Sequence, residues 1–355
     1  MKLGDICKIK YGKDHKKLND GSIPVYGSGG VMRHVDAVLW NKPSVLIPRK
    51  GTLGNLFYVD EPFWTVDTLF WTDIDTAQVV PKYLFYQLKT KDLASLNVGT
   101  AVPSLTTEVL NEVQIGLPSL EKQKQIVEVL GCIDAKIDVN TKLNGYLEEQ
   151  CEAVANHEKG FAVKLSSLCD LVKEKADYNE ANFDTYVSTE SLLPGKKGRQ
   201  TPSSLPQTGK VTVYKAGDIL VSNIRPYFKK IWYADRNGTC SGDVLVFRAK
   251  QPEQSGYLYS CMHSDAFFDY IMKGAKGTKM PRGDKKQMLT YKVASNPSGA
   301  TVDFIESALS QASSSSKEKH RLAGLRDVLL PKLMSGEIDV SKVDLKQLNS
   351  HLAAR

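Results

Sequence analysis

The hydrophobic residues between Ser119 and Val154 recur at steps of four and three, a period of about 3.5 residues that predicts a long helix with a coiled-coil seam. Ser119 suits the N-cap, because its hydroxyl can accept a hydrogen bond from a first-turn N–H. At about 1.5 Å per residue the helix would be roughly 54 Å long, which is typical of a spacer. Two polar seam positions weaken the seam but help to fix its register. The seam positions are Ile126, Leu130, Ile133, Ile137, Asn140, Asn144, Leu147, Cys151 and Val154.

A second stretch, Thr301–Met334, has the same pattern and is the candidate partner of the first helix. Four consecutive serines, Ser313–Ser316, interrupt its seam and predict a kink or fraying there. Its hydrophobic positions are Val302, Ile305, Leu309, Ala312, Leu322, Leu325, Leu329 and Leu333. The chain therefore alternates between a globular stretch and a long helix, twice.

The two globular stretches have matching patterns, as expected of diverged copies of one unit. Ser44–Val59 and Asp218–Ala234 each contain two hydrophobic runs joined by a basic turn, which predicts a hairpin. A third strand, a short helix and a Gly-Thr-x-x-Pro turn follow in each copy, and paired features lie 174 to 178 residues apart. These segments are Val66–Trp71, Tyr83–Leu88 and Gly99–Pro103 in the first copy, and Gly242–Phe247, Tyr257–Met262 and Gly277–Pro281 in the second.

The order of these elements predicts an α+β fold, in which two similar α/β domains are separated by two long antiparallel coiled-coil spacer helices. A chain of 355 residues fits two domains of ordinary size plus the helices. The expected boundaries are 1–117 for the first domain, 118–157 for the central helix, 158–298 for the second domain, 299–340 for the distal helix and 341–355 for a C-terminal tail.

Composition and charge narrow the class of protein. With 41% hydrophobic and 25% charged residues, both stretches can form cores. No apolar run is long enough to span a membrane, and the N-terminus lacks the apolar core of a signal peptide. The six cysteines are scattered without a CxxC pair, which argues against disulfides and zinc and favours reduced thiols in the cytoplasm.

The net charge of +7 is uneven along the chain. Residues 119–158 hold 4 Lys and Arg against 8 Asp and Glu, whereas residues 159–300 hold 22 against 13. The first helix is therefore acidic and the second globular stretch basic. A basic domain suggests a polyanionic partner, most commonly nucleic acid. The alternative is a basic surface that serves solubility.

A duplicated globule–helix unit of this kind resembles the specificity subunit of Type I restriction-modification systems, over nearly the whole chain. The most specific parts are GTAVPSL (Gly99–Leu105), LPSLEKQKQIVEVLGCIDAKI (Leu117–Ile137), LRDVLLPKLMSGEI (Leu325–Ile338) and the two hairpins. The resemblance implies that each globule is a target recognition domain reading one half of a split, asymmetric DNA site. It also implies that the helices pack antiparallel, set the distance between the halves and bind the modification subunits.

The resemblance further implies a non-catalytic subunit. Its partners would be double-stranded DNA, two modification (methyltransferase) subunits and restriction subunits that act as ATP-dependent translocase and nuclease, with no membrane. S-adenosylmethionine would bind the methyltransferase partner, and this chain would hold no cofactor. The helix positions expected to bind subunits are Ile126, Leu130, Ile133, Ile137, Leu147, Leu322, Leu325, Leu329 and Leu333.

Two other functions stay open: a stand-alone DNA-modifying enzyme and a DNA-binding regulator. Against the enzyme, Tyr26–Gly30 lacks the Lys-Ser/Thr of a P-loop and is better explained as a tight turn. Asn296–Gly299 lacks most of the amino-methyltransferase motif and is better explained as a turn before a helix. The six histidines have neither triad nor metal spacing. Against the regulator, the spacer helix is acidic and no helix-turn-helix pattern is present.

Loops rich in basic and aromatic residues are the candidates for DNA contacts, because arginine can bond a guanine edge bidentately and lysine mostly engages phosphates. Arg49 and Arg225 stand out, since a rigid hairpin tip can aim a side chain into the major groove. The alternative for each is a plain surface residue or a partner of Asp or Glu. Thr100 and Thr278 could hold a phosphate or cap a helix. The DNA-binding candidates are Lys13, Lys16, Arg33, Arg49, Lys50, Thr100, Arg199, Arg225, Tyr227, Lys229, Lys279 and Arg282.

Overall fold

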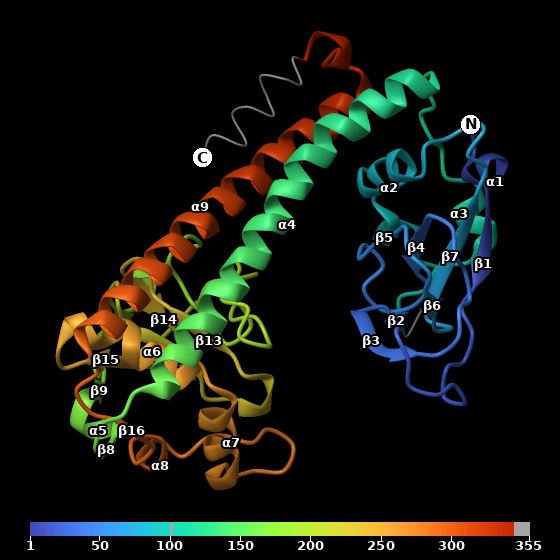
Figure 1. The fold of residues 1–355 in the computed structure, drawn as a ribbon. Helices are drawn as coiled ribbons and strands as arrows, with labels where there is room; N and C mark the ends of the chain where they lie inside the picture. Colours follow the sequence, from blue (N-terminus) through green and yellow to red (C-terminus); the bar gives the residue numbers. More distant parts are fainter. Residues whose placement is uncertain (100–101, 344–355) are drawn as a thin grey trace. The chain divides into compact units, whose positions relative to one another are not determined.

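The structure, a computed structural model, describes residues 1–99 and 102–343. It contains two compact units, one of Met1–Ile137 with His320–Arg355 and the other of Asp138–Lys319. Two long helices, α4 (Leu120–His157) and α9 (Gly299–Ser335), each contribute residues to both units (Figure 1). Within the described residues, no helix has the length and hydrophobicity needed to cross a bilayer.

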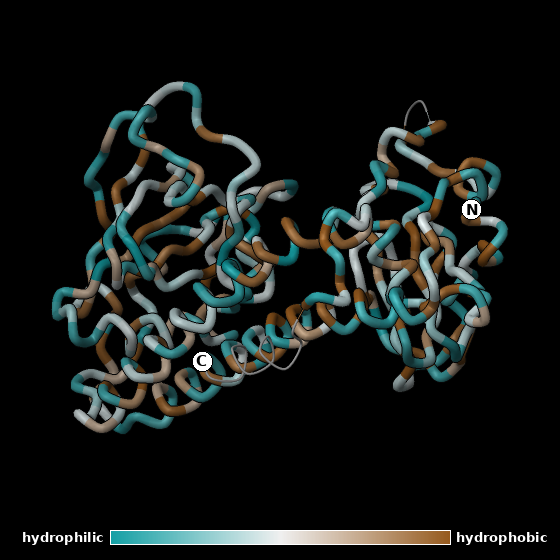
Figure 2. Tube along the Cα trace, turned by 90° about the horizontal axis from the view of Figure 1, so that it is seen from above, coloured by the Kyte–Doolittle hydropathy of each residue, from teal (hydrophilic) through white to brown (hydrophobic). Residues whose placement is uncertain are grey.

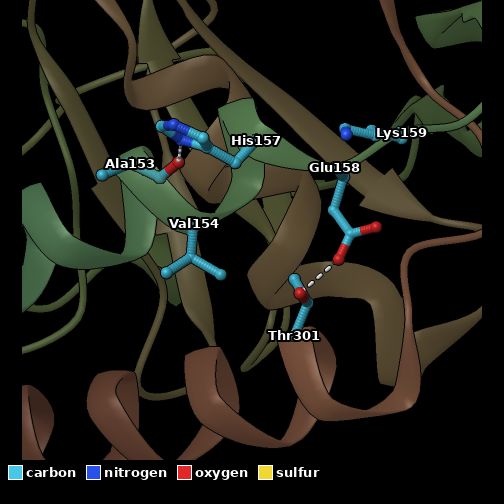
Figure 3. A pocket seen from close by; sticks show the side chains of 6 residues that line it. All are labelled: Ala153, Val154, His157, Glu158, Lys159 and Thr301. Carbon is cyan, nitrogen blue, oxygen red and sulfur yellow. Dashed lines mark hydrogen bonds between the residues drawn. The ribbon is translucent and has the colours of Figure 1, made fainter.

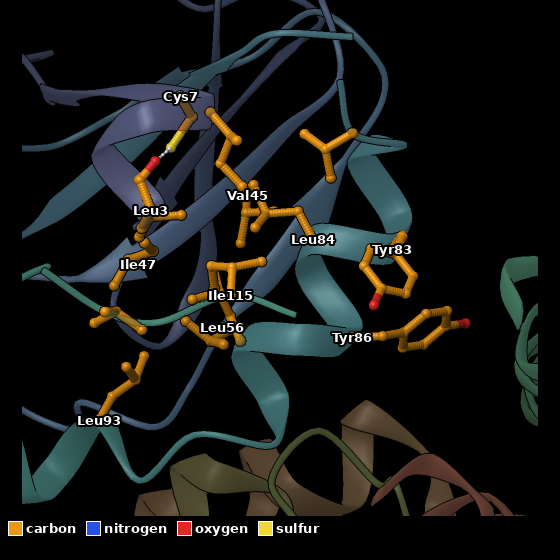
Figure 4. Packing of buried hydrophobic residues seen from close by; sticks show 14 of the residues in the cluster. Leu3, Cys7, Val45, Ile47, Leu56, Tyr83, Leu84, Tyr86, Leu93 and Ile115 are labelled. Atoms are coloured by element: carbon orange, nitrogen blue, oxygen red, sulfur yellow. Dashed lines mark hydrogen bonds between the residues drawn. The ribbon is translucent and has the colours of Figure 1, made fainter. Parts of the chain in front are cut away.

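The first unit is built on a four-stranded antiparallel sheet of order β1-β7-β4-β5 and a three-stranded sheet of order β3-β2-β6. Every residue of β4 is buried, because the strand lies inside the sheet and α2 packs on it. Figure 4 shows the resulting core, where Leu84 of α2 lies against Val45 of β4. The strands are β1 (Cys7–Tyr11), β2 (Ile23–Gly27), β3 (Gly30–Val35), β4 (Ser44–Pro48), β5 (Phe57–Val59), β6 (Trp64–Thr65) and β7 (Leu69–Ile74). The shorter helices are α1 (Leu3–Ile6), α2 (Pro81–Lys89), η1 (Leu93–Leu96), α3 (Thr107–Asn111) and η5 (Val340–Lys342).

The second unit is built on an antiparallel sheet of order β13-β12-β15-β9, with the smaller sheets β10-β11-β14 and β16-β8. In both units the hydrophobic segments gather in the interior (Figure 2). The strands are β8 (Ala162–Lys164), β9 (Cys169–Leu171), β10 (Lys175–Asp177), β11 (Lys210–Tyr214), β12 (Ile219–Ser222), β13 (Ile231–Tyr233), β14 (Gly238–Cys240), β15 (Val244–Ala249) and β16 (Lys292–Ala294). The helices are α5 (Leu165–Leu168), η2 (Tyr178–Glu180), η3 (Pro226–Phe228), η4 (Pro252–Gln254), α6 (Ser255–His263), α7 (Asp265–Gly274) and α8 (Lys285–Met288).

The main sheets of the two units have the same topology, which confirms the predicted duplication. Reading β5-β4-β7-β1 against β13-β12-β15-β9 pairs each strand with its counterpart. A small hydrogen bond is repeated as well: the thiol of Cys7 donates to the carbonyl of Leu3 at 3.4 Å, and that of Cys169 donates to Leu165 at 3.4 Å. The copies have diverged in their second sheets, since β2 and β6 are parallel whereas β11 and β14 are antiparallel.

Both predicted hairpins are confirmed. In the first, β4 pairs antiparallel with β5, and in the second β12 pairs with β13. The third strands begin two or three residues later than expected, because Val66 and Ser241 accept turn hydrogen bonds from Leu69 and Val244. The glycine-rich stretch Tyr26–Gly30 is the tight turn between β2 and β3, as predicted.

The long helices pair antiparallel within each unit. In the first unit Asp134 of α4 binds Arg326 of α9 at 3.2 Å. In the second, the Asn140 amide donates to Glu318 at 2.9 Å and the Asn144 amide donates to Ser316 at 2.8 Å. Asn140 is buried, so a polar layer lies in this seam where the sequence placed one. Such a layer specifies register, because a slipped pairing would leave the amides unsatisfied.

The helix termini and most seam positions agree with the prediction. Ser119 caps α4, its hydroxyl accepting from the N–H of Lys122 at 3.4 Å. Ser298 caps α9 through the N–H of Thr301, so Asn296–Gly299 is indeed a turn before a helix. Buried seam residues are Ile126, Leu130, Ile133, Cys151, Leu322 and Leu333, while Ile137, Leu147, Val154 and Leu329 are half-buried.

Two seam predictions were wrong. Leu325 is 42% exposed, because Arg326 occupies the inward position of that turn and binds Asp134, and Leu330 is buried one turn later. The serine run causes no break, since α9 is continuous from Gly299 to Ser335. Ser315 is only 4% exposed, so a small hydroxyl residue packs in the seam instead of interrupting the helix.

Candidate nucleic-acid interface

The hairpin tip of the first unit is tied to the loop that contains the Gly-Thr-x-x-Pro turn. The N–H of Gly51 donates to the carbonyl of Pro103 at 3.1 Å, and the N–H of Leu105 donates to that of Arg49 at 2.9 Å. Two segments about fifty residues apart in sequence therefore form one surface. The sequence revealed each segment separately but not that they pair.

The second unit repeats this arrangement with different residues. The N–H of Arg225 donates to the carbonyl of Pro281 at 2.8 Å, and that of Gly283 donates to Asn223 at 3.2 Å. The four paired positions match those of the first unit at offsets of 174 and 178, the same offsets that relate the hairpins and the turns. Each unit thus presents a composite surface, a hairpin tip laid against a Gly-Thr-x-x-Pro loop. The hairpin tip and the Gly-Thr-x-x-Pro loop keep these offsets between the two copies, and this was the sequence signal from which their pairing could have been predicted.

Comparison with known proteins agrees with this duplicated design. Residues 1–149 match the family model described as the Type I restriction modification DNA specificity domain. The chain is 21% identical to the EcoDI specificity subunit of Escherichia coli, over 95% of this chain and 88% of that protein. It is 22% identical to the MjaIX specificity subunit of Methanocaldococcus jannaschii, over 86% of this chain and 80% of that protein. The chain is thus similar to Type I restriction-modification specificity subunits over most of its length.

A solved structure supports the same fold. The S subunit of the Type I restriction-modification system from M. genitalium matches with a TM-score of 0.52 and 15% identity, covering 94% of this chain and 95% of that one. The predicted fold class, two similar domains with two long spacer helices, is thereby confirmed.

The hairpin tip of the second unit has an unusual backbone. Arg225 and Lys229 have φ of 50° and 51°, and Lys196, whose N–H donates to the carbonyl of Lys229 at 2.9 Å, has φ of 63°. Each left-handed non-glycine residue costs about 1–2 kcal/mol. Long side chains at such strained positions therefore point to a role for those side chains, either in contacts within the protein or in contacts with a ligand.

The side chains of Lys196 and Lys229 form ion pairs within the second unit. The Lys229 ammonium lies 2.9 Å from Asp265, and the Lys196 ammonium lies 3.0 Å from Asp265 and 3.3 Å from Glu152. The exposed Arg225 pairs with no carboxylate within residues 1–99 and 102–343. Arg225 is therefore the strained cation whose side chain stays available to a ligand.

An aromatic pair lies beside Arg225. Tyr227 and Phe228 are 48% and 39% exposed, and their rings are 4.7 Å apart between centroids. The buried Pro226 anchors the short helix η3 that carries them. A guanidinium next to exposed rings offers both hydrogen bonds and an apolar surface to base edges, such as a thymine methyl group.

The first tip differs in its available groups. The Arg49 guanidinium lies over the ring of Tyr11, 5.3 Å from its centroid, and donates to the carbonyl of Asp67 at 3.1 Å. Lys50 is exposed, and the part of the chain that the structure describes provides it with no ion pair. Arg49 is thus held against the domain on one side, and Lys50 projects beyond it.

The remaining basic candidates fall into two groups. Three arginines are engaged within their own units: Arg33 with Asp20 at 2.7 Å, Arg282 with Asp243 at 3.2 Å, and Arg199 with the Asp184 carbonyl at 2.6 Å and the Trp232 ring. Burial lowers the pKa of Arg199. Three lysines are exposed with no ion pair among the described residues, namely Lys13, Lys16 and Lys279.

The two threonines have separate outcomes. Thr100 lies outside the described residues. Thr278 is exposed and caps no helix, since α8 begins at Lys285 and is capped by Asp284. The helix-cap alternative is therefore wrong for Thr278, and its phosphate role stays a prediction.

The described residues include His, Cys, Asp and Glu side chains in both units. They hold no cluster of three or more His, Cys, Asp or Glu that could bind a metal ion. Burial raises the pKa of the Cys240 thiol to about 12, so it is no nucleophile at neutral pH. A shallow pocket at the ends of α4 and α9 is shown in Figure 3, where Glu158 accepts a hydrogen bond from Thr301 at the start of α9.

Proposed function

We propose that this chain is the specificity subunit of a Type I restriction-modification system and reads a split, asymmetric site in double-stranded DNA, one half with each of its two units, which we call recognition domains. The observation that carries the proposal is the composite surface, built on the same framework in both domains but with different tip residues. The first tip has Arg49 and Lys50, and the second has Arg225 followed by two aromatic rings. The positive charge of residues 159–300 adds sequence-independent attraction to phosphates.

A map of methylated bases in DNA from cells that express this chain with its modification subunit tests the proposal. Two different half-sites separated by an unread gap are expected. One continuous palindrome would contradict it, because two domains with different tips should not read identical adjoining halves.

We further propose that the chain is a scaffold without catalytic activity of its own. The modification subunits would bind the spacer helices and supply S-adenosylmethionine and the methyl transfer, and restriction subunits would join the same complex. Purified chain incubated with DNA and S-adenosylmethionine should transfer no methyl group until a modification subunit is added. Transfer by the chain alone would instead favour the stand-alone enzyme.

Substitutions on the helices should separate folding from partner binding. Ile133 is fully buried, and Leu325 is exposed on α9 next to Val328, which is also exposed. Ile133→Asp buries a charge and should destabilise the subunit by about 3–5 kcal/mol. Leu325→Asp should change stability by less than about 0.5 kcal/mol, yet weaken binding of the modification subunit. Denaturant melts and co-purification would measure the two effects, and normal assembly of a folded Leu325→Asp variant would remove this face from the interface.

A further inference from the structure

A chain of polar and charged side chains links α4 to the tip of the second recognition domain. It starts at His263 of α6, whose Nδ1 lies 3.0 Å from the Glu152 carboxylate of α4. Glu152 lies 3.3 Å from the Lys196 ammonium, which lies 3.0 Å from Asp265. Asp265, at the start of α7, lies 2.9 Å from the Lys229 ammonium at the tip. Three ion pairs therefore connect the spacer helix with the segment that carries Arg225.

The inner end of this network is well fixed. His263 is only 5% exposed in its side chain, and the Tyr259 hydroxyl donates to Glu148, one turn before Glu152, at 3.0 Å. The hydrogen bond from His263 and the neighbouring Lys196 hold the pKa of Glu152 below its usual range, so the carboxylate is charged at neutral pH. A charged group held this tightly on a long helix is a firm anchor for Lys196.

The outer end holds the strained backbone in place. The loop residues Gly195 and Lys196 donate their N–H groups to the carbonyls of Phe228 and Lys229, at 2.8 and 2.9 Å. Asp265 binds both Lys196 and Lys229, so one carboxylate joins the loop and the tip. Left-handed conformations persist only where the surroundings impose them. These ion pairs are the side-chain contacts that favour that conformation at Lys196 and Lys229.

The first recognition domain offers an internal comparison. Lys89 ends α2 at the position that corresponds to His263, 174 residues earlier. Within the described residues of that unit, no ion pair connects Arg49 or Lys50 to a spacer helix. The two domains share a framework, but this network belongs to the second.

We propose that Glu152, Lys196 and Asp265 are positioning residues for DNA reading, which clamp the second tip to the spacer helix so that Arg225 and Tyr227 meet the bases in a fixed pose. The inference rests on the proposed function, because it assigns the tip its role in recognition. It predicts that loosening the clamp reduces discrimination at one half-site only.

The test uses two variants in the full chain, each with a matched control. Glu152→Gln is compared with Glu149→Gln, a neighbouring exposed glutamate on α4, and Asp265→Asn with Asp269→Asn, an exposed aspartate on α7. Since Asp265 is 61% exposed, its substitution leaves the core intact. Hydrogen exchange of the amides of Arg225 and residues 227–230 is measured without DNA, and methylation with the modification subunit is measured on sites altered in either half.

The two clamp variants are expected to speed exchange at the tip about fivefold and to reduce discrimination in one half-site about fivefold, the upper range for a solvent-exposed ion pair. The other half-site and both controls should be unchanged. Equal exchange in the clamp and control variants would overturn the inference. Faster exchange with unchanged discrimination would also overturn it, provided that Arg225→Ala still impairs reading. If Arg225→Ala also leaves both half-sites unaffected, the role of the tip in the proposed function fails instead.

Discussion

Replacing Arg225 with alanine is expected to relax recognition at one half-site and to leave the other intact. The loss should be about 1–3 kcal/mol of discrimination at the contacted base, the usual value for one bidentate contact. Alanine at a φ of 50° has the same backbone strain as arginine. The variant therefore reports on the guanidinium and not on the fold. The measurement is methylation of a panel of sites, each altered at one base pair.

Two further variants separate base contacts from other effects. Lys279→Ala removes an exposed cation of the Gly-Thr-x-x-Pro loop and should weaken binding to all sequences, with a salt slope smaller by about one. Arg225→Gly should abolish the same discrimination as Arg225→Ala while stabilising the subunit by about 1 kcal/mol, because glycine tolerates the left-handed region. If Arg225→Ala instead weakened all sequences equally, Arg225 would be a phosphate contact.

The sequence was sufficient to predict the strands, the long helices and the duplication, because each of these depends on a local pattern of residues. Hydrophobic runs around basic turns predicted both hairpins, and the nearly constant offset between copies predicted one fold used twice. The helix period predicted α4 and α9 to within about three residues at each end. It failed at Leu325, because a seam of leucines could not reveal that Arg326 faces Asp134.

The candidate interface was less predictable, because the fate of a basic side chain depends on partners far away in sequence. Arg33 and Arg199 are loop cations like Arg225, yet both are engaged with neighbouring loops. The contact between Lys196 and Glu152 joins residues 44 positions apart, and that between His263 and Glu152 joins residues 111 apart. No local pattern encodes such pairs. The left-handed backbone at Arg225 is equally invisible in a sequence without glycine there.

Lengthening both spacer helices by four residues is expected to widen the gap between the half-sites by one or two base pairs. Four residues add one helical turn and about 6 Å, and a base pair occupies about 3.4 Å. The insertion also rotates the downstream part of each helix by roughly 40° beyond a full turn, close to the rotation of one base pair in a duplex of about 10.5 pairs per turn. The insertion belongs in both helices, after Asp138 in α4 and after Lys319 in α9, because their pairing is antiparallel and in register.

An insertion in α4 alone is the matched control. If Asp134 keeps its contact with Arg326 in the first unit, Asn140 and Asn144 shift by one turn relative to Glu318 and Ser316. Either the two asparagine contacts or the Asp134–Arg326 ion pair would be lost, so this variant should lose stability and methylation together. The paired variant should keep both half-sites and methylate them at the wider spacing. Full activity of the paired variant at the original gap would show that the helices do not set the distance. A spacer lengthened in both helices would then have no effect on the site that is read.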